Sequence, residues 1–442
     1  MSGFRRVLVC SHLSLAIFII AGSTGYSATR ISPLEAYHRA QAVFSEFELS
    51  PEIDFEPKAK LLDNQVSREE ILALLPYFDP WNGFGRFSRL SPEALEVFQD
   101  RDSRTEPDFS VKLNTVPSQL PANSGESLSK LRIAIDPGHM GDDLWDKRTD
   151  KFIVDSQGRK MSEGLLALQT ALLLERELKS LGAEVLLTRR ELRPVADLEF
   201  ADFDLAPYAQ TTFRESSLLE WFQQLLTTGP AGPALFRAFR NHTKVREIFS
   251  EEQRLLYFTN KVDLDSRAQL IEEFSPDITL ILHFDTAQNP HTVSSGYDGT
   301  KAYVAGAFLP EELSTGENRF ALIQHLAHHR QWRASVELSS QILSQIRTQL
   351  KIPLDSSGGG GSIRQVAPGV FARNLVLTRK IHNTALAFLE CFFYNDPREF
   401  KALSKAHASM NIGGRSYPYS ERLVQLTNAI RDGVLRFSES SH

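Results

Sequence analysis

The stretch Leu131-Arg-Ile-Ala-Ile-Asp-Pro-Gly-His139 decides the fold and supplies the first candidate functional residue. Residues 131–135 are β-rich, and the Asp-Pro-Gly turn stops the strand and leaves His139 just beyond its carboxyl end. In open α/β sheets, ligands and metal ions collect in the crevice beyond the carboxyl ends of the strands. His139 is therefore a candidate metal ligand. A histidine in a turn is more often a solvated surface group, so its partners must decide between the two interpretations.

A helix and a second strand follow this first strand along the chain. Residues 164–178 have the spacing of a helix with an almost continuous apolar face, Gly182 ends it, and residues 184–188 are again β-rich. A strand, helix, strand order is the signature of an α/β fold.

Three more polar residues stand at the edges of predicted elements. Glu163 opens the helix, His283 ends the apolar run 278–282, and Glu390 ends the run 384–389. Two imidazoles and one carboxylate form the ligand set typical of catalytic zinc, and a second carboxylate could serve as the base. The spacing is too wide for one local motif, so these groups would have to converge from separate elements. Taken alone, Glu163 is better explained as a helix-start residue, which the macrodipole favours by ~0.3–1 kcal/mol, and only its order relative to the other three residues favours a ligand.

The order of these residues resembles the zinc-dependent N-acetylmuramoyl-L-alanine amidases of type 3, a family of cell-wall enzymes. The similarity covers residues 131–437 with two interruptions. The matching segments are, in chain order, Ile133-Ala-Ile-Asp-Pro-Gly-His139, Glu163 before its apolar helix, Leu181-Gly-Ala-Glu-Val-Leu-Leu-Thr-Arg189, Arg267 with Pro276-Asp-Ile-Thr-Leu-Ile-Leu-His283, Asn383-Thr-Ala-Leu-Ala-Phe-Leu-Glu390 with Asn395, and Ala429-Ile-Arg-Asp-Gly-Val-Leu-Arg-Phe437.

The resemblance implies both a fold and a site. The fold would be an open twisted mixed sheet flanked by helices, with a smaller, mainly helical N-terminal region and helical insertions. Zinc would bind His139, Glu163 and His283, with Glu390 as the catalytic glutamate. Second-shell or substrate contacts would come from Asp136, Asp285, Arg267 and Asn395. The substrate would be peptidoglycan, cut at the amide that joins N-acetylmuramic acid to L-alanine of the stem peptide.

Two other functions stay open at this point. Metal chemistry alone fits a zinc peptidase that acts within the stem peptide, and the ordered motifs argue against it. A non-catalytic cell-wall-binding regulator on a degenerate amidase fold is the second alternative, and the intact set of four residues argues against it.

The first 27 residues have the pattern of a secretory signal peptide. Arg5 and Arg6 precede an apolar run, residues 7–21, which small residues follow. The alternative is an N-terminal membrane anchor, but the run is shorter than the ~20 apolar residues that a spanning helix needs. We therefore expect cleavage, no stable membrane anchor afterwards, and a periplasmic or secreted protein.

The remaining chain divides at about residue 128. Residues 28–128 are expected to form an accessory region and linker, with helices within 33–47 and 67–75, the second opened by a capping box of Ser67 and Glu70. A small helical collar packed on the enzyme is favoured over a wall-targeting or partner-binding module. Residues 129–440 would be the catalytic domain, with insertions near 193–262 and 290–331.

Two segments of the catalytic domain could regulate or shape the site. Residues 151–161 alternate in polarity and break at 155–158, which predicts a β-hairpin at the rim of the site. Some related amidases carry an inserted helix that covers the zinc until a protein activator displaces it. Residues 290–331 match its position, so autoinhibition and an activator are hypotheses. Within this segment His325 and His329 have metal-ligand spacing, but a polar helical face is favoured because no glutamate follows His325.

Composition excludes several other functions. The chain has 442 residues, of which 42% are hydrophobic and 24% charged, as in a soluble globular protein. With a formal net charge of −6 and no dense basic run, nucleic-acid binding is not expected. Signal cleavage would remove Cys10 and leave Cys391 without a disulfide partner. A buried small hydrophobe is the favoured interpretation of Cys391, ahead of a thiol nucleophile.

Overall fold

The computed structural model describes residues 54–99, 105–115, 128–203, 254–255, 257–287, 291–293, 296, 298–358 and 362–440. The predicted signal peptide, the helix predicted within 33–47, most of the predicted linker and most of the insertion near 193–262 lie outside the described residues. Residues 54–199 and 258–442 form one compact unit, which contains the whole candidate site.

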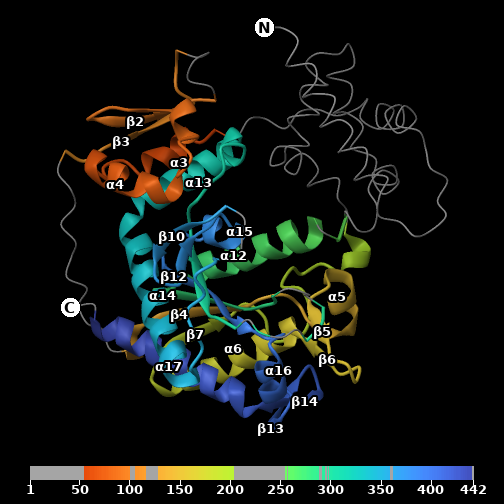
Figure 1. Cartoon of the computed structure of the whole chain (residues 1–442). Helices are drawn as coiled ribbons and strands as arrows, with labels where there is room; N and C mark the ends of the chain where they lie inside the picture. The colour runs from red at the N-terminus through yellow and green to blue at the C-terminus, as the bar shows by residue number, and fades with distance from the viewer. Residues whose placement is uncertain are drawn as a thin grey trace, which may run out of the picture. The chain divides into compact units, whose positions relative to one another are not determined.

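A seven-stranded mixed sheet forms the centre of this unit (Figure 1). In spatial order its strands are β10 (Arg364–Ala367), β11 (Val370–Ala372), β9 (Lys301–Val304), β12 (Ala385–Phe393), β8 (Ile278–Asp285), β4 (Arg132–Pro137) and β7 (Glu184–Leu187). β12, β8, β4 and β7 run parallel to one another, whereas β9 is antiparallel to β12. The predicted open mixed sheet is therefore confirmed, and the carboxyl ends of four parallel strands meet at one edge.

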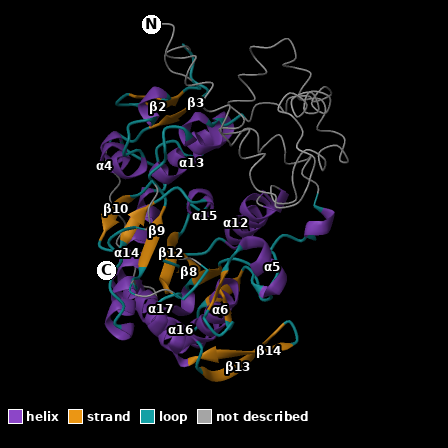
Figure 2. Ribbon diagram, turned by 45° about the vertical axis from the view of Figure 1, so that its right-hand side comes forward, coloured by secondary structure: helices purple, strands orange, loops and turns teal. Residues whose placement is uncertain are grey.

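Helices cover both faces of the sheet, as Figure 2 shows. Side chains alternate along each strand, so Ile133 and Ile135 of β4 enter one apolar core while Ala134 enters the other. The larger core is closed by α6 (Glu163–Ser180), α14 (His329–Leu350) and α17 (Glu421–Ser440), and the smaller by α12 (Asp263–Phe274) and α15 (Val376–Lys380). α17 and α14 pack closely at Gly433, where an added Cβ would come within 2.5 Å of Ile342 Cα.

The helix that carries Glu163 begins where the sequence predicted. The Ser162 side chain caps α6 by accepting a hydrogen bond from the Leu165 N–H (3.2 Å). The helix ends at Ser180, and Gly182 follows with φ of 95°, a conformation that favours glycine. This cap fixes Glu163 in the first turn, at the sheet edge where the parallel strands end.

The N-terminal region shares the larger core with the sheet. It contains α3 (Glu56–Lys60), α4 (Arg68–Phe78), and an antiparallel sheet of β1 (Ser88–Leu90), β2 (Ala94–Val97) and β3 (Phe109–Lys112), which the sequence did not predict. The capping box at the start of α4 is confirmed. The Ala307 N–H donates to Tyr77 O (2.8 Å), and the Phe78 ring packs against Trp332, with ring centroids 5.5 Å apart. The described part of this region thus packs against the elements around the central sheet.

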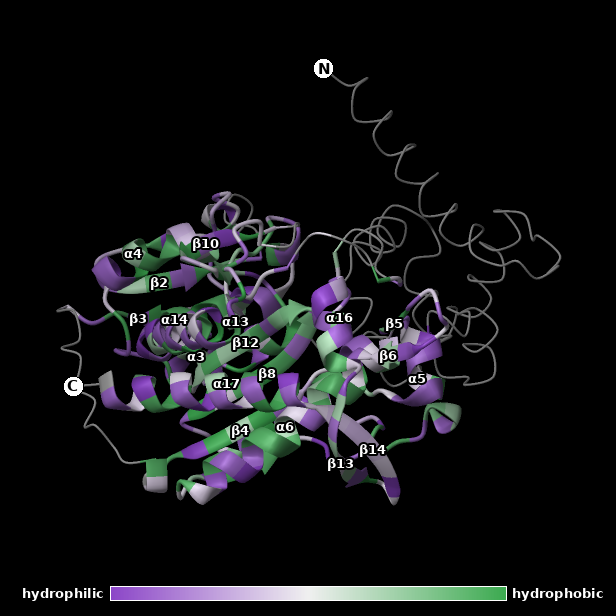
Figure 3. Ribbon diagram, turned by 60° about the horizontal axis from the view of Figure 1, so that its bottom comes forward, coloured by the Kyte–Doolittle hydropathy of each residue, from purple (hydrophilic) through white to green (hydrophobic). Residues whose placement is uncertain are grey.

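Smaller elements surround the carboxyl edge of the sheet. They are α5 (Asp142–Thr149), the hairpin of β5 (Phe152–Val154) and β6 (Lys160–Ser162), α16 (Pro397–Leu403), and the hairpin of β13 (Ala406–Ile412) and β14 (Arg415–Ser420). The β-hairpin predicted within 151–161 is confirmed as β5 and β6. Figure 3 shows that β4 and β8 are strongly apolar whereas α5 is mainly hydrophilic. Within the described residues, no helix combines the length and apolar character required to span a membrane.

The segment 290–331 differs from its prediction in two ways. It supplies β9, a strand of the central sheet, so it is more than an addition to the fold. The polar helical face predicted for its histidines is wrong, because His325 and His329 are both buried. His325, on α13 (Gly316–Ala327), has Nε2 3.0 Å from Arg379 O, and His329 Nε2 lies 3.1 Å from a Glu70 carboxylate oxygen. These contacts anchor α13 and the start of α14 to their neighbours.

Candidate metal centre

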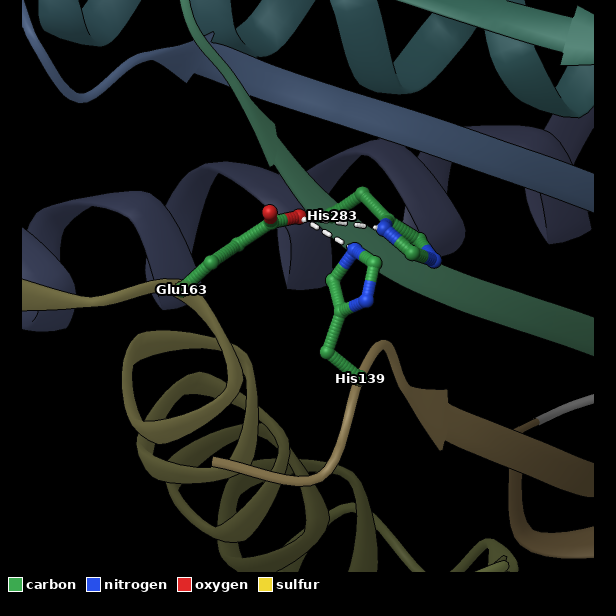
Figure 4. A group of neighbouring side chains, drawn as sticks. All are labelled: His139, Glu163 and His283. Atoms are coloured by element: carbon green, nitrogen blue, oxygen red, sulfur yellow. Dashed lines mark hydrogen bonds and ion pairs between the residues drawn. The ribbon is translucent and has the colours of Figure 1, made fainter. Parts of the chain in front are cut away.

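Three side chains from separate elements converge at the carboxyl edge of the sheet. His139 follows β4, Glu163 opens α6, and His283 lies near the end of β8 (Figure 4). Glu163 Oε1 lies 3.1 Å from His139 Nε2 and 3.1 Å from His283 Nδ1. One ligand atom from each residue lies within 4.8 Å of the others, which is close enough for all three to share one metal ion. Of the described residues, only these form such a group.

The turn after β4 brings the two imidazoles together. Gly138 N–H donates to Leu282 O (2.8 Å), which joins the turn to the strand that carries His283. A Cβ on Gly138 would lie 2.4 Å from the His283 ring, so only glycine leaves room for it. His139 then has φ of 55°. This left-handed conformation is uncommon for a residue other than glycine, although histidine adopts it more readily than most. It turns the imidazole towards His283, and the two ring centroids are 4.7 Å apart.

Glu163 and His283 are held by the surrounding fold. The Phe284 N–H donates to Glu163 Oε1 (3.2 Å), and the His283 ring stacks on Phe388, with a centroid distance of 4.6 Å. The Glu163 side chain is 5% exposed, and those of His139 and His283 are 22% and 15% exposed. The three donors are therefore pre-positioned, with the histidines open to the cleft on one side.

The electrostatics of this group favour the states in which it can bind a cation. Burial lowers the pKa of His139 to about 4, so its imidazole is neutral at pH 7. Burial alone would raise the pKa of Glu163, but His139 and His283 hold this pKa well below its ordinary value. A metal ion needs neutral imidazoles and ionised carboxylates as ligands.

Glu390 lies beside this group, and its pKa is shifted in the opposite direction to that of Glu163. It is paired with His283 in the β8–β12 register, and both side chains line the same cleft. Burial raises the pKa of Glu390 well above its ordinary value, and Asp285 and Glu163 add to the rise. A carboxylate with a raised pKa accepts a proton more readily, as a general base at neutral pH must. The prediction that Glu390 ends its strand is wrong, because β12 continues to Phe393.

Two buried arginines hold the turn that carries His139. Arg267 donates to Asp136 Oδ1 (2.9 Å), Asp263 Oδ2 (2.7 Å) and the carbonyls of Pro137 and His139. Arg189, for which the sequence predicts no role, donates to the Pro137, Gly138 and Gly164 carbonyls. Arg267 and Asp136 are 1% and 0% exposed, so a substrate contact is wrong for both. They act on the site by positioning the turn.

The other two predicted supporting residues have different places. Asp285 lines the cleft and accepts a hydrogen bond from the buried Lys301 Nζ (2.5 Å), which also pairs with Asp355 (2.8 Å). Asn395 is fully buried and binds Ala287 through both its amide oxygen and its amide nitrogen, at 3.0 and 2.8 Å. Asn395 therefore holds the loop after β8 and does not reach the cleft.

The cleft above the three candidate ligands has a volume of about 310 Å³. Its walls include residues that are not among the predicted site residues. The described residues that line it are His139, Thr149, Asp150, Lys151, Glu163, His283, Phe284, Asp285, Thr286, His291, Glu390 and Tyr394. Lys151 and His291 come from the predicted hairpin and from the loop after β8. The predicted position of the hairpin at the rim of the site was the only signal in the sequence that pointed towards these two residues.

Two rival interpretations of nearby residues are answered by the same geometry. Cys391 is fully buried, and burial raises the pKa of its thiol well above the ordinary value, which disfavours a thiol nucleophile.

α13 does not cover the site. Its His325 contacts Arg379 and lies in a cavity with Thr384 and Leu386, at the amino end of β12. From Ala385 to Glu390 the strand runs roughly 16 Å. α13 therefore does not cover the candidate ligands, and autoinhibition by the rest of the segment 290–331 stays a prediction.

Comparison with known proteins agrees with the family suggested by the motifs. A family model described as N-acetylmuramoyl-L-alanine amidase matches residues 239–416, a range that includes His283 and Glu390. No curated protein matches the chain. Among solved structures, Ami1 of Mycobacterium smegmatis, an N-acetylmuramyl-L-alanine amidase, is 13% identical, with 71% of this chain and 100% of that chain covered at a TM-score of 0.38.

Two further solved structures have similar values. The CwlD amidase of Clostridioides difficile, solved in complex with the GerS lipoprotein, is 14% identical, with 70% of this chain and 98% of that chain covered and a TM-score of 0.35. The N-acetylmuramoyl-L-alanine amidase AmiC2 of Nostoc punctiforme is 13% identical, with 70% and 97% covered and a TM-score of 0.35. Similarity at this level carries no argument about activity. Residues 239–416 of this chain match the model of the N-acetylmuramoyl-L-alanine amidase family.

Proposed function

We propose that this protein is a zinc-dependent peptidoglycan hydrolase that cleaves the amide between N-acetylmuramic acid and L-alanine of the stem peptide. The observation that carries the proposal is the meeting of His139, Glu163 and His283 in one cleft with Glu390. The amidase family match supplies the substrate class.

The donor set fits zinc in number and kind. Two imidazole nitrogens and one carboxylate oxygen are the ligands of many catalytic zinc sites, in which a fourth position stays open. Here Glu163 Oε1 lies at the same 3.1 Å from each imidazole nitrogen, so the three donors already face a common point. Zinc bound at these residues would supply Lewis-acid polarisation of the scissile carbonyl and would lower the pKa of a water molecule.

Glu390 is proposed as the general base and then the general acid. Its raised pKa suits it to take a proton from the attacking water while the new carbon–oxygen bond forms. As the carbon–nitrogen bond of the amide breaks, Glu390 returns this proton to the amine of L-alanine. The products are the lactyl carboxylate of muramic acid and a stem peptide with a free amino terminus.

The site is also proposed to work outside the cytoplasm. The first 27 residues have the features of a signal peptide, and peptidoglycan lies outside the cell membrane, so we infer a periplasmic or secreted enzyme. A protein activator stays a prediction. Detection of the mature amino terminus after residue 23 or 27 in the exported fraction would test the export.

The decisive experiment identifies the products released from purified peptidoglycan. The mature protein with zinc should release stem peptides that begin with L-alanine, and Glu390→Gln should lower this rate by roughly 10²–10⁴-fold without loss of cooperative unfolding. Mass spectrometry distinguishes the alternatives. Cuts within the stem peptide would indicate a zinc peptidase, and binding to peptidoglycan without any release would indicate a non-catalytic regulator.

A further inference from the structure

Lys151 is the one lysine of the described residues that lines the candidate site, and the proposed mechanism does not use it. It stands between α5 and β5, and its carbonyl accepts a hydrogen bond from the Glu163 N–H (3.0 Å). The start of the hairpin is therefore joined directly to the start of α6. This bond places Lys151 next to a candidate ligand, although the two residues are twelve positions apart in the sequence.

The hairpin that carries Lys151 is held on several sides. The Val154 N–H donates to His291 O (3.0 Å), and Val154 forms a bridge with Thr292 in the loop after β8. On the other strand, the Ser162 hydroxyl donates to Asp146 (2.8 Å). Lys151 therefore stands on a well-anchored segment and lines the cleft.

The charge of Lys151 has no partner in the described part of the protein. Other lysines near the site are paired: Lys160 with Asp143 and Asp146, and the buried Lys301 with Asp285 and Asp355. Lys151 is half-buried and forms no ion pair with a described residue. Burial is the largest influence on the pKa values of His139, Glu163 and Glu390, and the charge of Lys151 contributes to all three. The ammonium is thus within electrostatic reach of the whole site.

We propose that Lys151 is a specificity-determining residue that pairs with a carboxylate of the substrate, one residue beyond the scissile amide. This inference rests on the proposed function for the identity of the ligand. In the stem peptide, the residue after L-alanine is a D-glutamate linked through its side chain, which leaves its α-carboxylate available. In some cell walls this carboxylate is replaced by a neutral amide. Lys151 would favour the charged form.

The dimensions agree with this assignment. A cleft of about 310 Å³ is roughly 7 Å across, and two extended residues span at most about 7 Å. A substrate whose scissile amide lies at His139, Glu163 and His283 therefore carries its next carboxylate to the wall of the same cleft. Two of the other cleft carboxylates are already paired, Asp285 with Lys301 and Glu163 with the two histidines, whereas Asp150 and Glu390 also line the cleft.

The test compares two small substrates that differ only in this group: N-acetylmuramoyl-L-alanyl-D-glutamate and its α-carboxamide. Cleavage is followed with zinc in the wild type and in Lys151→Met, which removes the charge and keeps most of the side chain. Lys151→Arg is the conservative variant, and Lys147→Met, at an exposed lysine of α5, is the matched control. Binding of both compounds is measured separately by calorimetry in a Glu390→Gln background.

We expect the wild type to prefer the carboxylate by about tenfold, mainly through KM and through binding. Lys151→Met should lose the preference and leave the amide substrate unchanged, while Lys151→Arg and Lys147→Met should retain it. An equal loss of kcat on both substrates in Lys151→Met would overturn the inference, because Lys151 would then act on the reacting carbonyl. Equal binding of both compounds by the wild type would also overturn it. A binding preference without cleavage of either compound would refute the proposed amidase and leave the role of Lys151 supported.

Discussion

Gly138→Ala tests whether the turn after β4 sets the geometry of the metal centre. The added Cβ would lie 2.4 Å from Cε1 and Nε2 of His283, whereas ordinary van der Waals contacts begin near 3.4 Å. The imidazole must therefore move by about 1 Å. It has little freedom to do so, because Phe388 stacks on one face, the edge contacts His139, and Nδ1 faces Glu163.

The size of the effect follows from this displacement. Catalytic groups must be held to within about 0.5 Å, and a displacement of about 1 Å can cost on the order of 10²-fold in rate. We expect Gly138→Ala to lower kcat/KM for stem-peptide release by roughly 100-fold and to weaken zinc binding by at least about tenfold. The rate is measured by mass spectrometry of the released peptides, and zinc affinity by competition with a chelator.

The matched control is Gly85→Ala, where an added Cβ has no atom within 4 Å. It should change neither quantity. If Gly138→Ala kept its activity and zinc affinity to within about threefold while remaining folded, the close approach of the turn to His283 would not matter, and the reasoning would be refuted.

Three further predictions concern stability. Arg267→Leu leaves the buried Asp136 and Asp263 without their charged partner and should lower the free energy of unfolding by about 3–5 kcal/mol, as measured by denaturant titration. The control Arg176→Leu removes a mainly exposed ion pair and should change this free energy by less than about 0.5 kcal/mol. Burial, with Glu399 and Asp396, raises the pKa of Asp298 to about 6, so its ionised form destabilises the fold; that cost is absent below about pH 4 and complete above about pH 6. Asp298→Asn should accordingly raise the melting temperature at pH 7 and leave it unchanged at pH 4, and an equal shift at both values would contradict this sign. Zinc should raise the melting temperature of the wild type by mass action but not that of Glu163→Gln, and equal shifts in both would remove Glu163 from the ligand set.

Local patterns predicted the elements that carry their own signals. The helix after Glu163 has a cap, an apolar face and a terminating glycine, and the hairpin at 151–161 has alternation broken by a turn. Both were found within a residue or two of the predicted positions. The three short strands of the N-terminal sheet were missed because strands of three or four residues are too short to show a period of two.

The sequence also did not predict which polar side chains are buried. His325 and His329 looked like a polar face because the spacing of a helix does not reveal which neighbours will cover it. In the fold, Phe78 packs on His325 and Glu70 pairs with His329, and both partners come from α4, far away in the sequence. The carbonyls that Arg189 and Arg267 bind could not be predicted either. Every residue has a backbone carbonyl, so the sequence does not single out the acceptors.

The kinds of residues available for chemistry, and the elements on which they stand, follow from local patterns: a histidine after a strand, a glutamate at a helix start, and a histidine and a glutamate in two apolar runs. Their meeting at one site depends on the packing of the whole fold. His283 and Glu390 become neighbours through the parallel pairing of β8 and β12, and Gly138 lets the His139 turn approach His283. The same pairing and packing placed Lys151 in the cleft and α13 at the far end of β12. Contacts of this kind depend on strand register and on close packing between segments more than a hundred residues apart, and no local pattern encodes either.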